Sequence, residues 1–212
     1  MNNAPRGVQR PVSRALDVAH GRIVGNRRLT VLARQLADLL PPNATVLDVG
    51  CGDGQLTSRV AALRPDCSFR GLDVLARSDT AIPVDLFDGQ RIPAPDRSVD
   101  AVMFVDVLHH TDDPNVLLRE ARRVARECVV IKDHRRDGVL AGTTLRVMDW
   151  VGNAHHGVRL PYNYWSERQW RDAFRSNGLE PEIWKQRLGI HAPLLDAIVG
   201  RGLHFIARLI PV

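Results

Sequence analysis

The chain has 212 residues, enough for one well-buried domain, and 44% of them are hydrophobic, as in ordinary globular proteins. Its net charge of +5 comes from scattered arginines offset by 24 acidic residues, so no clustered basic surface for nucleic acid is expected. No apolar run reaches the roughly 20 residues that a membrane span needs. Three cysteines without metal-ligand spacing, and a polar N-terminus without a signal-peptide core, favour a cytoplasmic protein.

The first part of the chain differs from the rest. Residues 1–25 are expected to form an N-terminal arm with a short helix, and residues 26–212 a single domain. The arm is rich in proline, asparagine and arginine, and its first 13 residues show no hydrophobic period. A longer helix is predicted from Asn26 to Leu40, because leucines recur on one face and Pro41-Pro42 ends the pattern.

Strands and helices then alternate up to residue 133. Strands are predicted over about 44–49, 68–72, 81–84, 99–107 and 128–132, with helices over about 54–63 and 115–126. Asp113-Pro114 is expected to open the second of these helices. The link between the second and third strands is too short for a regular crossover helix. The alternation predicts an α/β fold: a doubly wound, Rossmann-like, mostly parallel sheet with helices on both faces.

The C-terminal part is expected to add a helix and an antiparallel strand pair. Ser166 is a predicted N-cap, with Gln169 in the capping-box position and Gly178 as the stop. Two strands are predicted after this helix, over about 180–188 and 203–209. Residues 134–165, which precede it, carry several aromatic and histidine side chains and are expected to form a cap over a binding pocket.

A glycine-rich turn follows the first strand of the sheet. Gly50, Gly52 and Gly54 allow a sharp bend and a close approach of backbone to a ligand, and Asp48 and Asp53 bracket them. Acids inside such a turn repel a pyrophosphate but suit an ammonium or a sulfonium. The spacing also differs from the G-x-G-x-x-G of dinucleotide-binding proteins, and no P-loop G-K-[ST] is present.

These residues resemble those of a known family. Val46-Leu47-Asp48-Val49-Gly50-Cys51-Gly52-Asp53-Gly54 resembles the first motif of the class I S-adenosylmethionine-dependent methyltransferases. Gly71-Leu72-Asp73-Val74, Val84-Asp85-Leu86 and Val105-Asp106-Val107-Leu108-His109-His110 resemble the later motifs, in the family's order. The last of them is similar to the small-molecule subgroup of the ubiquinone-biosynthesis type. The resemblance covers residues 40–133 closely and implies S-adenosyl-L-methionine as cofactor and S-adenosyl-L-homocysteine as product.

The resemblance also implies a set of cofactor contacts. Asp73 would accept hydrogen bonds from both ribose hydroxyls, Val74 and Leu86 would sandwich the adenine, and Asp85 would accept from its amino group. The methionine end would lie against Asp48 and the glycine turn. The whole expected set comprises Asp48, Gly50, Cys51, Gly52, Gly54, Asp73, Val74, Asp85, Leu86, Val105 and Asp106.

Catalytic residues are expected where the fourth and fifth strands end. The resemblance points to His109, His110 and Asp133, with His109 as general base for an acceptor hydroxyl; an imidazole with a pKa of about 6.5 suits that task. A purely structural histidine pair is an equal alternative. Acceptor contacts are expected from His155, His156, Tyr162 and Tyr164. A zinc site built from the histidines has no supporting spacing, so no metal is expected.

The expected function is methyl transfer to a small organic acceptor, at oxygen in preference to nitrogen or carbon. A nucleic-acid or protein methyltransferase is the first alternative, although the fourth strand lacks the Asn/Asp-Pro-Pro-aromatic motif that presents an exocyclic amine. A non-catalytic, cofactor-binding partner subunit is the second alternative. No nucleic-acid partner is expected, and a homodimer is compatible with the sequence.

Overall fold

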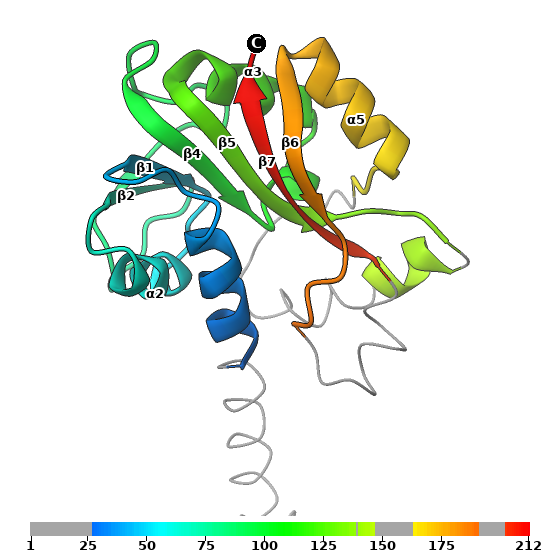
Figure 1. Ribbon diagram of the computed structural model, residues 1–212, viewed down its shortest axis with the longest axis horizontal. Coiled ribbons are helices and arrows are strands. Elements are labelled where there is room, and N and C mark those ends of the chain that lie inside the picture. The colour runs from blue at the N-terminus through cyan, green and yellow to red at the C-terminus, as the bar shows by residue number, and fades with distance from the viewer. Residues whose placement is uncertain (1–26, 139, 147–162, 191–201) are drawn as a thin grey trace, which may run out of the picture.

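The computed structural model describes residues 27–138, 140–146, 163–190 and 202–212. A seven-stranded sheet in the order β3-β2-β1-β4-β5-β7-β6 forms its centre (Figure 1). Strands β1 to β5 are parallel, whereas β7 pairs antiparallel with both β5 and β6. The strands are β1 (Thr45–Val49), β2 (Ser68–Asp73), β3 (Val84–Leu86), β4 (Val99–Val105), β5 (Ala125–His134), β6 (Leu179–Lys185) and β7 (His204–Pro211). The predicted mostly parallel sheet and the antiparallel C-terminal pair are confirmed.

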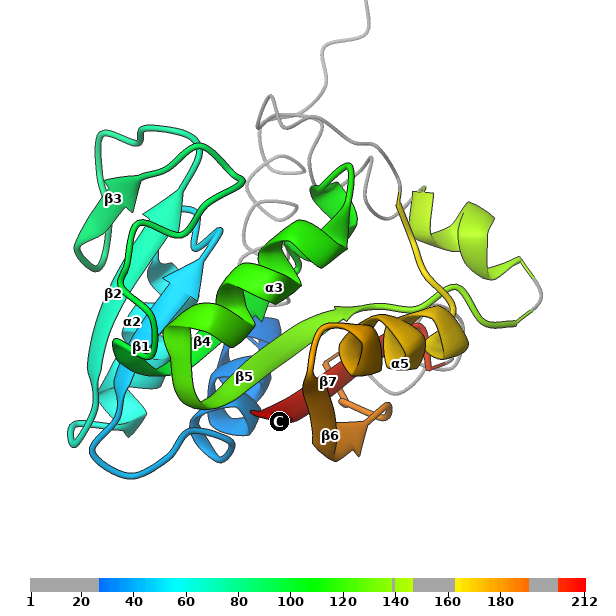
Figure 2. The same ribbon diagram turned by 90° about the horizontal axis from the view of Figure 1, so that it is seen from above.

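Helices cover both faces of this sheet, as the alternation of elements predicts (Figure 2). Residues 27–37 form a helix whose buried leucines pack on one face, together with α2 (Gln55–Leu63). On the other face lie α3 (Pro114–Val124) and α5 (Glu167–Ser176), whose Trp170 and Phe174 are fully buried. A short 3-10 helix, η1 (Leu108–His110), follows β4. No helix in the described ranges is long and apolar enough to cross a membrane.

Two predicted helix starts are confirmed in detail. Asp113 caps α3 by accepting from the backbone N–H of Asn115, and Pro114 takes the first helical position, where its missing N–H is no loss. Ser166 and Gln169 form the reciprocal capping box at the start of α5. Both caps lie in the connections that lead away from the carboxyl end of the sheet, so they determine where these connections end.

Several boundaries differ from the predicted ones, for tertiary reasons. β3 lies at 84–86 instead of 81–84, because its pairing with β2 begins only opposite Gly71. β4 ends at Val105, since Asp106 adopts a positive φ of 57° and turns the chain into η1. β5 begins three residues before the predicted start, directly after α3, and its ten residues pair with β4 on one side and β7 on the other.

The order of the strands determines where a ligand can bind. β1 lies between β2 and β4, so the crossover connections leave it in opposite directions. In open α/β sheets this switch point opens a crevice at the carboxyl ends of the strands. The glycine turn after β1, Asp73 at the end of β2 and Asp106 after β4 all lie at this edge.

Candidate active site

The glycine turn after β1 is tied to the neighbouring strand and leaves room above it. The backbone N–H groups of Gly50 and Cys51 both donate to the carbonyl of Leu72, at 2.7 and 3.2 Å. Gly52 and Gly54 have φ values of 62° and 73°. A Cβ on Gly54 would lie 2.6 Å from Cγ1 of Ile82, but one on Gly52 would meet nothing closer than an Arg77 nitrogen at 3.9 Å. The space over Gly52 is therefore open to a ligand.

Asp73 holds this turn in place and retains hydrogen-bonding capacity. Its Oδ2 accepts from the N–H of Gly52 at 2.8 Å, and its Oδ1 accepts from the N–H of Leu75 at 2.9 Å. Each carboxylate oxygen has a second lone pair. The carboxylate can thus accept from two neighbouring hydroxyl groups while it continues to hold the turn, which is what the ribose of the cofactor requires.

Asp48 is buried beneath the turn with one oxygen unsatisfied. The Thr57 hydroxyl donates to its Oδ2, while Oδ1 has no hydrogen-bond partner among the described residues. Burial raises the pKa of Asp48 to about 7, against the lowering effect of the Thr57 hydrogen bond and with a smaller contribution from the charge of Asp73. A buried, unpartnered carboxylate oxygen is costly unless a donor arrives, so it is suited to receive an ammonium group.

A small cavity of about 170 Å³ lies between Asp48 and the end of β4. The helix over 27–37 forms one of its walls, and the glycine turn, α2 and the end of β4 form the others. Its lining consists of Arg28, Leu29, Leu32, Asp48, Gly50, Cys51, Leu56, Val105 and Asp106. Its lining thus includes both carboxylates and a guanidinium, groups that can bind the ammonium and the carboxylate of an amino acid.

The predicted adenine-side residues lie in two different places. Val74 and Leu86 expose 56% and 59% of their surfaces, as apolar flanks for a ring would. Asp85 instead pairs with Arg70 at 2.5 Å, away from the glycine turn. Asp88 was not among the predicted site residues. It holds the turn after β3 by accepting hydrogen bonds from the N–H groups of Gln90 and Arg91, both at 2.8 Å.

The turn at Asp88 belongs to the cofactor side of the sheet. The N–H of Phe87 donates to the carbonyl of Asp73 at 3.1 Å, and a Cβ on Gly89 would lie 3.1 Å from Cγ1 of Val74. The hydrogen bonds from the backbone N–H groups of Arg91 and Gln90 lower the pKa of Asp88, so its carboxylate is ionised at neutral pH. The signal in the sequence is its position directly before the glycine of a turn that follows a strand.

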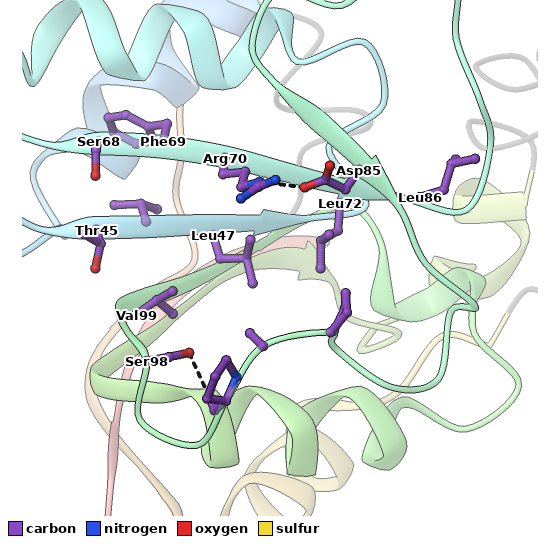
Figure 3. A pocket seen from close by; sticks show the side chains of 14 residues that line it. Thr45, Leu47, Ser68, Phe69, Arg70, Leu72, Asp85, Leu86, Ser98 and Val99 are labelled. Carbon is purple, nitrogen blue, oxygen red and sulfur yellow. Dashed lines mark hydrogen bonds and ion pairs between the residues drawn. The ribbon is translucent and has the colours of Figure 1, made fainter.

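A larger groove, of about 730 Å³, lies on the face of the sheet instead of at its carboxyl edge (Figure 3). Leu47, Leu72 and the Arg70–Asp85 pair line it, opposite the connection that contains Pro93 and Pro95. The connection between β3 and β4 contains no helix, so this part of the sheet is left uncovered. The smaller cavity, and not this groove, contains the residues of the glycine turn.

His109 and Asp133 come together, as the resemblance implies. His109 lies in η1 after β4, and its Nδ1 is 2.6 Å from Oδ1 of Asp133 in β5; both side chains are buried. Asp133 also accepts from the N–H groups of Leu108 and His134, at 3.1 and 2.7 Å. Burial alone would raise the pKa of Asp133, but the charge and hydrogen bond of the His109 side chain, together with those of the His134 side chain, hold it well below its usual range. An ionised Asp133 makes Nδ1 of His109 the donor, so the lone pair of the ring lies on Nε2.

Two other rings pack against the ring of His109. The His110 ring lies 4.0 Å from it and the Tyr164 ring 5.4 Å, nearly parallel, with an interplanar angle of 24°. Tyr164 is buried, and its hydroxyl donates to the carbonyl of Leu145 at 3.2 Å. Tyr164 therefore packs against the ring of His109 while its hydroxyl is bound to a backbone carbonyl, and a contact with the acceptor stays a prediction. The other expected acceptor residues, His155, His156 and Tyr162, lie outside the described residues.

A second charged cluster adjoins this pair. Lys132 is fully buried, and its ammonium donates to Asp106, which also receives Arg28 at 2.7 Å. Burial lowers the pKa of Lys132, against the raising effect of Asp106. His134 lies 3.5 Å from Asp106, and burial, together with the charge of Lys132, lowers its pKa to about 4. A lysine inside an otherwise apolar strand was the signal in the sequence for this cluster.

His109, Asp133 and His134 also bring potential metal-ligand atoms within 4.8 Å of one another. The hydrogen bonds that Asp133 accepts account for this approach without an ion. Lys132 and Arg28 contact the nearby carboxylate of Asp106, and their charges weaken the attraction of this region for a cation.

Residues 22–182 match the protein family described as "Methyltransferase domain". The chain belongs to the class I S-adenosylmethionine-dependent methyltransferases. The cofactor of this methyltransferase is therefore S-adenosyl-L-methionine, and the site described above agrees with it: an unsatisfied acid for the ammonium, an acid for the ribose and an open glycine turn between them.

Curated relatives act on diverse small molecules, as their names state. The methyltransferase is 30% identical over 140 residues to a 2-methyl-6-phytyl-1,4-hydroquinone methyltransferase of Synechocystis, covering 61% of this chain and 39% of the relative. It is 30% identical over 112 residues to a 27-O-demethylrifamycin SV methyltransferase of Amycolatopsis mediterranei, covering 46% and 41%. The chain thus matches about two-fifths of the length of these relatives.

A solved structure shows the same fold. The putative methyltransferase in complex with the Haloferax volcanii Trm112 methyltransferase activator superimposes with a TM-score of 0.66. At 15% sequence identity, the similarity covers 97% of this chain and 99% of that one. It confirms the arrangement of the sheet and helices in this methyltransferase.

Proposed function

We propose that this methyltransferase transfers the methyl group to a hydroxyl of a small organic acceptor, with His109 as general base. The observation that carries the proposal is the buried contact between Nδ1 of His109 and Asp133 at 2.6 Å, beside the carboxyl end of β4. A carboxylate that holds Nδ1 as donor leaves Nε2 to receive a proton. Such a pair is useful to an enzyme that must deprotonate its acceptor, and hydroxyl groups require this more than amines do.

Positioning and proton removal are the tasks left to the protein. S-adenosylmethionine supplies a methyl carbon that its sulfonium already activates. The chain's own residues must then align the acceptor oxygen, exclude water and take the proton on His109. Tyr164 and His110 contribute by packing against the ring of His109. The name of one relative, the 27-O-demethylrifamycin SV methyltransferase, supports an oxygen acceptor, whereas that of another, a dimethylglycine N-methyltransferase, gives nitrogen as the alternative.

The adenine is assigned to the space between Val74 and the turn after β3. Asp88 is preferred to Asp85 as acceptor from the adenine amino group, because Asp85 is held by Arg70 at 2.5 Å. The backbone of the turn at Gly89 lies against Val74, one residue beyond the ribose-binding Asp73. The remaining expectations, a single domain with an acceptor-side cap at 134–165, a homodimer and a cytoplasmic location, stay predictions.

The test compares His109 variants in turnover and in cofactor binding. A panel of phenols, hydroquinones, aliphatic alcohols and amines is incubated with S-adenosylmethionine, and released S-adenosylhomocysteine is measured. We expect hydroxyl acceptors to be preferred, and H109A and D133N to lower turnover by about 100-fold or more, since general-base catalysis contributes that much. Affinity for S-adenosylhomocysteine, measured by calorimetry, should stay within about twofold because neither residue lines the cofactor cavity.

The control is D112A, a change at an exposed carboxylate close to η1 but outside the His109–Asp133 pair. It should keep the turnover of the unmodified enzyme. Turnover by H109A within a few-fold of the unmodified enzyme would refute the general-base assignment. A preference for amines over every hydroxyl acceptor would refute the acceptor class.

A further inference from the structure

The turn that carries His109 is short. In η1, the N–H of His110 donates to the carbonyl of Val107 at 2.9 Å, and the N–H of Thr111 donates to that of Leu108 at 3.1 Å. A 3-10 helix has poor hydrogen-bond geometry, and the carbonyls at the end of a helix have no partner within it. The position of His109 therefore depends on donors from another part of the chain.

Asn163 supplies these donors. Its backbone N–H donates to the carbonyl of His109 at 3.2 Å, and its side-chain Nδ2 donates to the carbonyls of Thr111 and Asp112, at 3.3 and 3.2 Å. A side-chain amide has two N–H donors, so it can bind two carbonyls at once. Although 52 positions separate Asn163 from Thr111, it completes the hydrogen bonding of η1 from outside the turn.

The chain that follows Asn163 is itself fixed to the sheet. The carbonyl of Trp165 accepts from the N–H of Arg136 at 2.8 Å, just after β5, the strand that contains Asp133. One residue later, Ser166 caps α5. This stretch therefore joins the turn that carries the proposed general base to the strand that carries its carboxylate.

We propose that Asn163 is a positioning residue, which holds η1 so that His109 stays aligned with Asp133. Nδ1 of His109 lies 2.6 Å from Oδ1 of Asp133, and a hydrogen bond weakens steeply when its geometry is disturbed. A misplacement of about 1 Å can lower a rate by about 100-fold. Asn163 acts through the backbone of η1 and not on the acceptor itself. The inference rests on the proposed role of His109 and adds a residue that controls it.

The test replaces the amide by a carboxylate of the same size. N163D removes both side-chain donors and turns an acceptor toward the carbonyls of Thr111 and Asp112. The matched control is N177D, because Nδ2 of Asn177 donates to the carbonyl of Ala173 at 2.7 Å, at the end of α5 and not at η1. The Asp112 contact is made by its backbone, which D112A leaves in place.

Kinetics in the full-length enzyme provide the first readout. With S-adenosylmethionine and the preferred hydroxyl acceptor, N163D should lower kcat by about 10- to 100-fold, because the base is misplaced. The KM of the acceptor and the affinity for S-adenosylhomocysteine should stay within about threefold. N177D should keep kcat within about threefold, although it also loses a hydrogen bond to a helix-end carbonyl.

Nuclear magnetic resonance of protein labelled with ¹⁵N-histidine provides a second readout, which does not depend on turnover. The Nδ1–H of His109 bound to Asp133 should give a low-field proton signal that is absent from H109A. We expect N177D to keep this signal and N163D to shift it to higher field or broaden it. If N163D does not fold, N163A removes the same two donors without adding an acceptor, and should change the signal in the same direction.

Two results would overturn the inference: an unchanged His109 signal in the Asn163 variant, or the same loss of signal and kcat in N177D. The outcome is distinct from that of the proposed function. Full turnover by H109A would refute the general base, while a changed signal in N163D would still show that Asn163 positions the ring. An inactive H109A with an unchanged signal in N163D would refute only the role of Asn163.

Discussion

Among the residues of the cofactor cavity, Asp48 is the one whose protonation state a bound ligand should change most. It is buried, one of its oxygens has no hydrogen-bond partner among the described residues, and burial raises its pKa to about 7. A carboxyl group in this state is partly protonated near neutral pH. An arriving ammonium favours the ionised form, so cofactor binding should release a proton.

The prediction is that affinity for S-adenosylhomocysteine rises with pH up to about 7 and levels off above it. At a pH below the raised pKa of Asp48, binding of the ligand must remove the proton from this carboxyl group. The affinity therefore falls by up to about tenfold for each pH unit below that pKa. Calorimetry at pH 6 in buffers of different ionisation enthalpy should show release of about one proton per ligand bound. In D48N this proton release should vanish; the same release from D48N would contradict the assignment to Asp48.

At the scale of elements, the junction between β1 and α2 combines a structural and a functional requirement. Gly54 is the N-cap of α2 in the left-handed conformation, and the side chain and backbone of Ile82 fill the space a Cβ would take. Gly52 has a similar backbone conformation but open space in front of it. The same turn therefore contains one glycine required by packing and one that, as we propose, leaves room for the ligand.

Two alanine variants should separate these requirements. G54A should destabilise the free protein by about 2–4 kcal/mol, because strain in the left-handed region adds to the clash with Ile82. G52A should cost only about 1–2 kcal/mol from strain. Its affinity for S-adenosylhomocysteine should nevertheless fall by at least about tenfold, since the new methyl occupies the ligand's space. Denaturant unfolding and calorimetry provide the two readouts; an affinity of G52A equal to that of the unmodified protein would contradict the open-turn interpretation.

On the scale of the whole molecule, the cofactor site joins elements from distant parts of the chain. The cavity takes its walls from the helix over 27–37, from β1 and α2, and from the end of β4. Asp73 adds β2, and the Asp88 turn adds the segment after β3. A ligand in this site should therefore stabilise the whole sheet against unfolding and not a single loop.

We predict that S-adenosylhomocysteine at 100 times its dissociation constant adds about 2.7 kcal/mol to the unfolding free energy. For a chain of this length, this corresponds to a rise in Tm of about 5–10 °C. D73N should abolish most of the rise, because the carboxylate then presents an amide to the ribose hydroxyls. D85N is the control, since Asp85 pairs with Arg70 in the groove and should keep the full rise. An equal loss in both variants would contradict the assignment.

The sequence predicts most of the fold and the identity of the cofactor. The alternation of apolar runs with helical periods predicts the parallel sheet, and the Asp113 and Ser166 caps are read from local residues alone. These features depend only on residues that are close together in the sequence. The turn at Gly50, Gly52 and Gly54 is likewise local, because its conformations need glycine irrespective of the partners.

The finer parts of the site depended on contacts between distant residues. Asp85 and Asp88 are equally plausible acids in the sequence, and only the 2.5 Å pairing with Arg70 separates them. Tyr164 was expected at the acceptor, but the fold stacks it on His109, 55 positions earlier in the chain.

By itself, then, the sequence determined the fold class, the glycine turn and the methyl donor, because each depends on patterns of residues that are close together in the sequence. Only the tertiary structure decided which charges meet. It brings Arg28 to Asp106 across 78 positions and His109 to Asp133 across 24, and it buries Lys132 between them. Electrostatic partners are chosen by distance in space, and local sequence patterns do not encode that distance.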